Sequence, residues 1–238
     1  MSNLENILKI QNSTDTSADL YFYGDIVSSW WQSWDDSDQY PDAIKDFLNG
    51  VEGKDLNIYI NSGGGSVFAG IAIYNMLKRH TGYKTVHIDG VAASIASIIA
   101  LSADKIIIPA NAFFMVHKAW GGISGNSDEM RKYADHLDKI DMSMLEIYKS
   151  NLKNEADIDI IRSMISEETW LTGEEACKYF NMELEEPIEA VAYSGEMLDK
   201  YKNTPQKINM KGNKKIPEIK NDIEIKKKEL LLKFDFGF

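Results

Sequence analysis

The stretch LNIYINSGGGSVFAGIAIYNMLKR, residues 56–79, decides the fold. Its first five residues alternate between apolar and polar positions and are rich in isoleucine, which predicts a strand. Three consecutive glycines follow at 63–65, and residues 67–79 then carry apolar side chains at helical spacing. A strand, a glycine turn and a helix in this order are typical of a parallel β-α unit.

The same order of elements continues on both sides of this stretch. We expect further strands at 20–26, 85–88, 105–108 and 112–117. An Ala- and Ser-rich segment, residues 91–102, separates two of these strands as a short helix would. This repetition predicts an α/β domain built on a parallel sheet.

Three helices are expected after residue 120. The first covers about 126–152, and its apolar residues follow a heptad-like stripe, which predicts packing on another helix, either of the same chain or of a neighbouring subunit. A second helix covers 157–166. A third begins at Thr172, because two glutamates follow that capping residue. The stripe consists of Met130, Tyr133, Leu137, Ile140, Met144 and Ile147.

Length and composition limit the class of protein. With 238 residues and 44% hydrophobic residues, the chain can bury one sizeable core. No stretch is long and apolar enough to cross a membrane, and no secretory signal is recognisable. Cys177 is the only cysteine, so we expect neither an intramolecular disulfide nor a Cys-based zinc site, and a cytoplasmic location fits.

The charge is unevenly distributed along the chain. The net charge is -11, yet residues 200–238 hold 11 Lys against 5 Asp and Glu. The acidic body argues against nucleic-acid binding. We interpret the basic end as a solvated extension, with contact to acidic partners as the alternative.

Two segments could carry chemistry. The glycine loop at 63–65 could present backbone N–H groups to an anion or an oxyanion, although it could also be a plain tight turn. Residues 90–97, GVAASIAS, would place Ser94 at a helix N-terminus, where developing negative charge is stabilised. Close packing of small residues is the alternative, and Ser97 and Ser102 are rival serines deeper in the helix.

His117 ends an apolar strand just before a Gly-Gly loop, whereas the other three histidines have simpler structural explanations. Taken alone, Ser94 and His117 are each more simply explained by structure. Together they would supply a nucleophile and its general base.

Four segments, in this order, carry a family resemblance. Residues 60–74, INSGGGSVFAGIAIY, are followed by GVAASIA at 90–96, MVHKAWGG at 115–122 and WLTGEEA at 170–176. They resemble the motifs of the Clp protease proteolytic-subunit family. Residues 23–26, Trp30-Trp31, 67–75 and 168–172 further resemble the phage and prophage head-maturation branch of that family. Two departures are Gly63, where the family has proline, and residues 179–183, which lack a glycine.

The resemblance implies an α/β fold with ClpP/crotonase-like repeated ββα units and a protruding handle helix. It also implies a site without metal or cofactor. Its third catalytic group, the acid, is Glu168, with Glu167 as a rival, where the family usually has Asp. The implied site residues are the nucleophile Ser94, the base His117, the acid Glu168, the oxyanion-hole amides of Gly65 and Ile95, and the substrate-binding loop Gly63 and Gly64.

The implied function is an ATP-independent serine endopeptidase that cleaves protein substrates such as phage capsid and scaffold proteins. Family members form homo-oligomeric rings, commonly two stacked heptamers. We expect a flexible lead-in over 1–19, a peptidase domain over 20–195 and a flexible basic tail over 196–238. Two alternatives stay open: a crotonase-fold acyl-CoA enzyme, and a non-enzymatic capsid-assembly protein with a decayed site.

Overall fold

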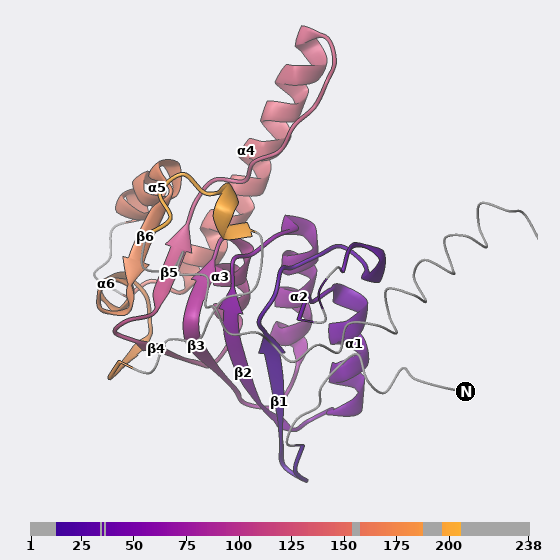
Figure 1. Cartoon of the computed structure of the whole chain (residues 1–238), viewed down its shortest axis with the longest axis vertical. Coiled ribbons are helices and arrows are strands. Elements are labelled where there is room, and N and C mark those ends of the chain that lie inside the picture. The colour runs from indigo at the N-terminus through magenta and orange to yellow at the C-terminus, as the bar shows by residue number, and fades with distance from the viewer. Residues whose placement is uncertain (1–12, 34, 36, 154–157, 188–196, 206–238) are drawn as a thin grey trace, which may run out of the picture.

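A seven-stranded sheet forms the centre of the molecule (Figure 1). The structure, a computed structural model, describes residues 13–33, 35, 37–153, 158–187 and 197–205. The α/β fold expected from the sequence is confirmed, although the first strand begins at Ser17 rather than at residue 20. The strands are β1 (Ser17–Phe22), β2 (Asp55–Ser62), β3 (Lys84–Ala93), β4 (Lys105–Pro109), β5 (Phe113–Val116), β6 (Thr169–Thr172) and β7 (Glu183–Glu185).

The long strand β3 organises the sheet. Strands β1, β2, β3, β4 and β7 are neighbours in that order and all pair in parallel. The first half of β3 pairs with β4, whereas its last residues, 91–93, pair with β5. β6 then runs antiparallel to β5. The carboxyl end of β3 therefore lies beside the carboxyl end of β5.

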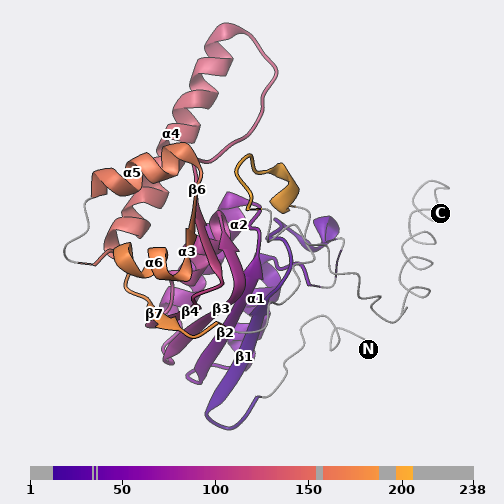
Figure 2. The same cartoon turned by 60° about the vertical axis from the view of Figure 1, so that its left-hand side comes forward.

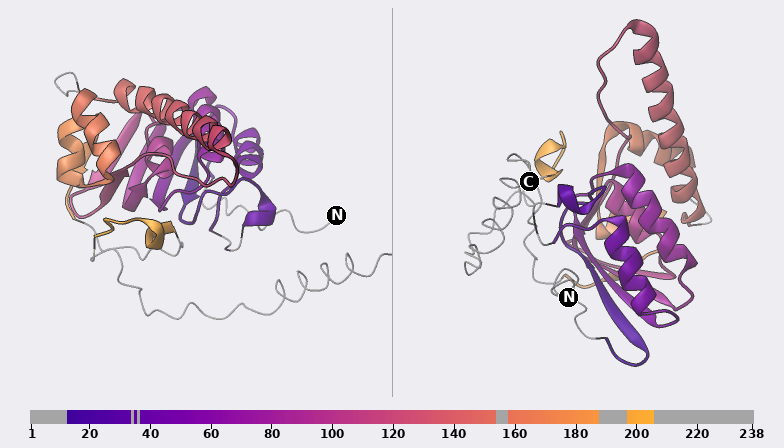
Figure 3. Two further views of the ribbon diagram at one scale, coloured as in Figure 1. Left: turned by 90° about the horizontal axis from the view of Figure 1, so that it is seen from above. Right: turned by 90° about the vertical axis from the view of Figure 1, so that its right-hand side faces the viewer.

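Helices α1, α2 and α3 cover one face of the sheet (Figures 1 and 3). Predicted and observed helix ends agree closely because the caps are present: Ser66 accepts from the Ala69 N–H, and Asn126 and Thr172 each form a capping box. The helices are α1 (Pro41–Gly50), α2 (Val67–Arg79), α3 (Ile95–Ala100), α4 (Ser127–Ser150), α5 (Ile158–Glu167) and α6 (Gly173–Tyr179), with 3-10 turns η1 (Trp30–Gln32) and η2 (Met197–Lys200).

Helix α4 projects from the body, as the handle helix implied by the resemblance would (Figures 1 and 2). The helix packs within the chain against α3 and α5, and Tyr133, nearer its start, lies against the loop at Gly121. Met144 and Tyr148, towards the C-terminal end, are buried, whereas Met130, near the other end, is 49% exposed. The predicted apolar stripe is therefore buried most deeply at Met144, half-buried at Tyr133 and Leu137, and exposed at Met130.

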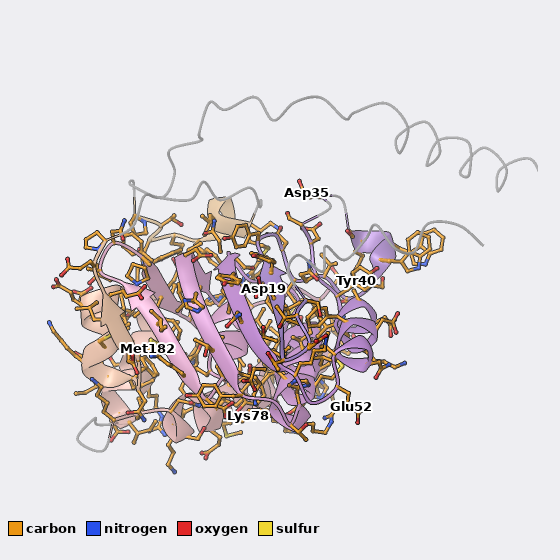
Figure 4. The ribbon with its side chains drawn as sticks, turned by 90° about the horizontal axis from the view of Figure 1, so that it is seen from below. Asp19, Asp35, Tyr40, Glu52, Lys78 and Met182 are labelled. Atoms are coloured by element: carbon orange, nitrogen blue, oxygen red, sulfur yellow. The ribbon has the colours of Figure 1, made fainter. Side chains whose placement is uncertain are left out.

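The two faces of the sheet bury different sets of side chains because successive residues of a strand point to opposite sides. Ala92 and Phe114 belong to the main core under the helices, seen from below with its side chains in Figure 4. Val91, Ala93 and Met115 face the other way and pack with η2, which lies across the sheet from α2 and α3 (Figure 3).

Parts of the expected lead-in and tail, residues 1–12 and 206–238, lie outside the described residues, as does 188–196. Within the described ranges, no helix is both long and apolar enough to span a membrane.

Candidate active site

Ser94 is the single residue between β3 and α3, and its backbone has φ 56° and ψ -128°. Glycine favours this region, and other residues occupy it at a cost of about 1–3 kcal/mol. Two hydrogen bonds hold the conformation. The Ser94 N–H donates to the Met115 carbonyl at 3.0 Å, and the Ser97 hydroxyl donates to the Ser94 carbonyl at 2.5 Å.

His117 lies beside this serine. Ala93 is in register with Met115, so the residues that follow the two strands are brought together. His117 Nε2 lies 2.7 Å from Ser94 Oγ, and the imidazole is only 8% exposed. In the tautomer that leaves Nε2 unprotonated, the Ser94 hydroxyl donates to it, which is the arrangement of a nucleophile and a general base.

Glu168 lies beside His117 because of the antiparallel pairing of β5 and β6, in which Val116 is opposite Thr169. Glu168 itself has a positive φ of 53°. Glu167 is instead the last residue of α5, and its side chain accepts a hydrogen bond from Ser163 at 3.4 Å. The structure thus favours Glu168 over its neighbour as the carboxylate that faces His117.

Burial lowers the pKa of His117 below its ordinary value, while the negative charge of Glu168 acts in the opposite direction. The imidazole is therefore neutral, and able to accept a proton, at neutral pH. Glu168 Oε1 accepts a hydrogen bond from the Asn203 N–H at 2.7 Å. Among the described residues, no hydrogen bond joins Glu168 directly to His117.

The glycine loop, residues 63–65, lies beside Ser94 in space. At Gly64, a Cβ atom would lie 2.7 Å from the Ala93 carbonyl oxygen and 2.8 Å from Ser94 Cβ, so only glycine allows this approach. Ile26 donates to Gly64 O and accepts from the Ser66 N–H, which forms a parallel bridge centred on Gly65. In such a bridge the N–H of the central residue points away from its partner strand.

A second amide lies at the same place. Ile95 is the first residue of α3, a position whose N–H has no acceptor within the helix. The position that a Cβ of Gly64 would take is 3.2 Å from this nitrogen. The two amides expected as oxyanion donors, those of Gly65 and Ile95, therefore belong to segments that meet at Ser94.

Ser94, His117 and Gly65 line one cavity of about 1000 Å³. Residues 26–28 and the start of α2 form one wall, and the inner part of α4 forms the other. Its volume is at the upper end of the range for ligand-binding pockets, and Met197 and Lys200 also line it. The part of the chain that the structure describes contains no cluster of His, Cys, Asp and Glu that could hold a metal ion.

Sequence reasoning missed three residues at this site. Tyr148 is buried in α4, and its hydroxyl lies 2.7 Å from Ser97 Oγ. Tyr201 and Asn203 reach the site from the segment that follows η2. Tyr148 lies four residues after Met144, on the same face of the helix, and could have been suspected. No signal in the sequence pointed to the other two.

Comparison with known proteins agrees with this geometry. The family model described as Clp protease matches residues 47–180. Among curated proteins, the chain is similar to ATP-dependent Clp protease proteolytic subunits. It is 33% identical to that of Ligilactobacillus salivarius over 129 residues, which are 53% of this chain and 64% of the relative. It is 28% identical to that of Bacteroides thetaiotaomicron over 137 residues, which are 56% and 61%.

The match covers more than half of the chain, from the end of α1 to the end of α6, and includes the glycine loop, Ser94 and His117. The chain therefore belongs to the Clp protease family. It spans less than two thirds of the length of the curated relatives named above.

The backbone of Ser94 allows a test of stored strain. We expect Ser94→Gly to be about 1 kcal/mol more stable than Ser94→Ala, because glycine adopts this φ and ψ without steric cost and neither variant has a hydroxyl. Urea unfolding of both variants measures the difference. Ser97→Gly against Ser97→Ala is the control, where glycine should be the less stable because Ser97 lies within a helix. Equal stability of the two Ser94 variants would contradict the strain.

Proposed function

We propose that this chain is a serine endopeptidase that hydrolyses peptide bonds through an acyl-enzyme at Ser94. The observation that carries the proposal is the 2.7 Å separation of Ser94 Oγ and His117 Nε2. Its support comes from the strained backbone of Ser94, the adjacent glycine loop and the membership of the Clp protease family.

In the first half of the proposed reaction, Ser94 Oγ attacks the scissile carbonyl carbon and its proton passes to His117 Nε2. The oxyanion of the tetrahedral intermediate accepts hydrogen bonds from the N–H groups of Gly65 and Ile95. The C–N bond then breaks as His117 returns the proton to the leaving amine. A water molecule, activated by the same imidazole, hydrolyses the ester and regenerates Ser94.

Glu168 is the proposed third member of the triad. Its negative charge stabilises the imidazolium that forms during each step, and its place opposite His117 lets a carboxylate orient the ring. Gly63 and Gly64 would offer backbone groups to the extended substrate, since they border the nucleophile without side chains. No cofactor or metal takes part in this proposed mechanism.

The same family membership supports wider proposals. We propose that the chain works without an ATP-driven partner and cleaves capsid or scaffold proteins, on the resemblance of residues 23–31 and 67–75 to head-maturation proteases. Mass spectrometry after co-expression with the capsid protein, with Ser94→Ala as the control, tests this substrate. Equal processing by both chains would contradict it.

A fluorophosphonate probe tests the peptidase against its two rivals. We expect wild-type protein to be labelled at Ser94, and His117→Ala to reduce the labelling rate roughly a thousandfold or more, because the serine then has no general base. His87→Ala is the matched control, since His87 lies on β3 away from the site. Intact-mass measurement and peptide mapping locate the label.

The rivals predict other results. An acyl-CoA enzyme would leave Ser94 unlabelled and turn over CoA thioesters. A decayed site would show neither activity. The short distance between Ser94 and His117 favours the peptidase, because a crotonase-type reaction does not require such a pair.

The pH dependence tests the role of Glu168. Because its charge raises the pKa of His117, Glu168→Gln should lower that pKa further. The acid limb of the labelling rate should therefore move to lower pH, while the rate at neutral pH falls roughly 10³–10⁴-fold because the imidazolium loses its stabilising charge and its orienting partner. Rates measured from pH 4 to 8 show both effects, and Glu167→Gln is the control. An acid limb that stays in place would contradict the assignment.

The exposed part of α4 supports a proposal of homo-oligomers, with two stacked heptameric rings as the model from the family. Met130 and Met142 are 49% and 59% exposed on this helix, and a second copy could bury them. We expect light scattering to give a mass several times 26.9 kDa, and Met142→Glu to reduce it. Arg131→Ala is the exposed control, and a wild-type monomer at micromolar concentration would contradict the proposal.

A further inference from the structure

A short segment beyond the family match, residues 197–205, packs on the candidate site. Met197, Leu198 and Tyr201 are 8%, 4% and 7% exposed. They form a second small core with the face of the sheet that the helices leave uncovered, in contact with Val91, Ala93, Met115, Phe113 and Trp170. All three side chains are buried, so the segment is a fitted part of the molecule rather than a loose end.

Tyr201 occupies the space between the glycine loop and His117. Its hydroxyl donates to the Gly63 carbonyl oxygen at 2.5 Å. Its ring meets the His117 ring edge to face, with the centroids 5.1 Å apart, and the Trp170 ring at 5.9 Å. Burial raises the pKa of Tyr201 to about 12, against the effect of a hydrogen bond with the Ser94 side chain. The hydroxyl is therefore protonated, and a donor, at neutral pH.

A substrate needs the same space. Nucleophilic attack requires a carbonyl carbon about 3–3.5 Å from Ser94 Oγ. Tyr201 lies against His117, the imidazole that contacts Ser94 Oγ, with the two ring centroids 5.1 Å apart. It also uses the Gly63 carbonyl, a backbone acceptor that an extended peptide along the glycine loop would use. Tyr201 and a peptide that pairs with the Gly63 carbonyl therefore exclude each other.

The segment also forms hydrogen bonds with Glu168, the proposed acid of the triad. The Asn203 N–H donates to Glu168 Oε1 at 2.7 Å, and its side-chain amide donates to the carbonyls of Glu167 and Glu168 at 3.1 and 3.2 Å. Thr204 donates to the Leu198 carbonyl at 2.9 Å, which closes the segment into a compact turn. The contacts thus reach the glycine loop, the base and the acid together.

We propose that residues 197–204 are an intramolecular inhibitor, which covers the glycine-loop side of the peptide-binding surface beside Ser94 and must leave before an extended substrate can pair with that loop. This inference rests on the proposed function, because it concerns access to the same serine. An occupant tethered to the chain competes at high effective concentration, so the apparent reactivity is reduced by the fraction of molecules in which the site is open.

The labelling rate of Ser94 by a fluorophosphonate probe tests the inhibitor. We expect Tyr201→Ala to raise this rate about tenfold or more, because it removes both the buried ring and the bond to Gly63. Tyr201→Phe, which keeps the ring, should give a smaller increase. Lys202→Ala is the matched control, since that side chain is exposed in the same segment, and it should label at the wild-type rate.

Hydrogen–deuterium exchange of residues 197–204 gives a second readout. In wild-type protein these amides should be protected, and covalent labelling of Ser94 should increase their exchange because the probe displaces the segment. Protection that is unchanged by labelling would overturn the inhibitor.

The outcomes separate the two proposals. Equal labelling of wild type and Tyr201→Ala would leave the peptidase intact and overturn the inhibitor. Slower labelling of Tyr201→Ala would also overturn the inhibitor, because the segment would then support the active-site geometry rather than block access to it. If neither protein is labelled, the proposed function fails, and the inhibitor fails with it.

Discussion

The Ser94 N–H donates to the Met115 carbonyl at 3.0 Å, and this bond ties the end of β3 to β5 at the point where the chain turns into α3. The turn requires a positive φ at a residue with a side chain, which is unfavourable unless the surroundings fix it. With β3 held in this way, the side chain of Ser94 is aimed at the residue that follows β5. The separation of Ser94 and His117 is thus a consequence of sheet pairing, not of flexible side chains.

The same constraint extends into the helices. Ser97 donates to the Ser94 carbonyl, and the Tyr148 hydroxyl lies 2.7 Å from Ser97 Oγ. Tyr148 comes from α4, so the inner half of the projecting helix is connected to the turn that presents the nucleophile. On the other side of the turn, Gly64 approaches Ala93 and Ser94 more closely than any side chain would permit. Small residues and one buried tyrosine therefore fix the serine from both sides.

Much of this arrangement could be predicted from the sequence because it depends on local signals. Residues 67–79 form a helix as their spacing predicts, and two other helices begin directly after the N-caps Asn126 and Thr172. The placement of Ser94 and His117 at neighbouring strand ends follows from the parallel order. The choice between Glu167 and Glu168 needed the register of β6, which no local pattern contains.

The contacts of Tyr201 could not be predicted, for a related reason. Tyr201 and Gly63 are 138 residues apart, and a nine-residue segment without periodicity gives no indication of the surface that it covers. The basic composition of the surrounding sequence suggested a solvated extension, whereas Met197, Leu198 and Tyr201 are apolar anchors within it. Three well-placed anchors outweigh average composition in deciding whether a short segment docks.

The position of Asn203 links access to the site with the arrangement of its groups. One oxygen of Glu168 accepts the Asn203 N–H, while only the charge of Glu168 acts on His117. When the segment leaves, this oxygen loses its donor, and the imidazole N–H of His117 is a donor of suitable chemistry to replace it. Removing the inhibitor would therefore open the substrate surface and, in the same step, free the carboxylate that orients the base. Because the segment binds Glu168 as well as the glycine loop, the substrate surface stays covered while the carboxylate stays bound to Asn203.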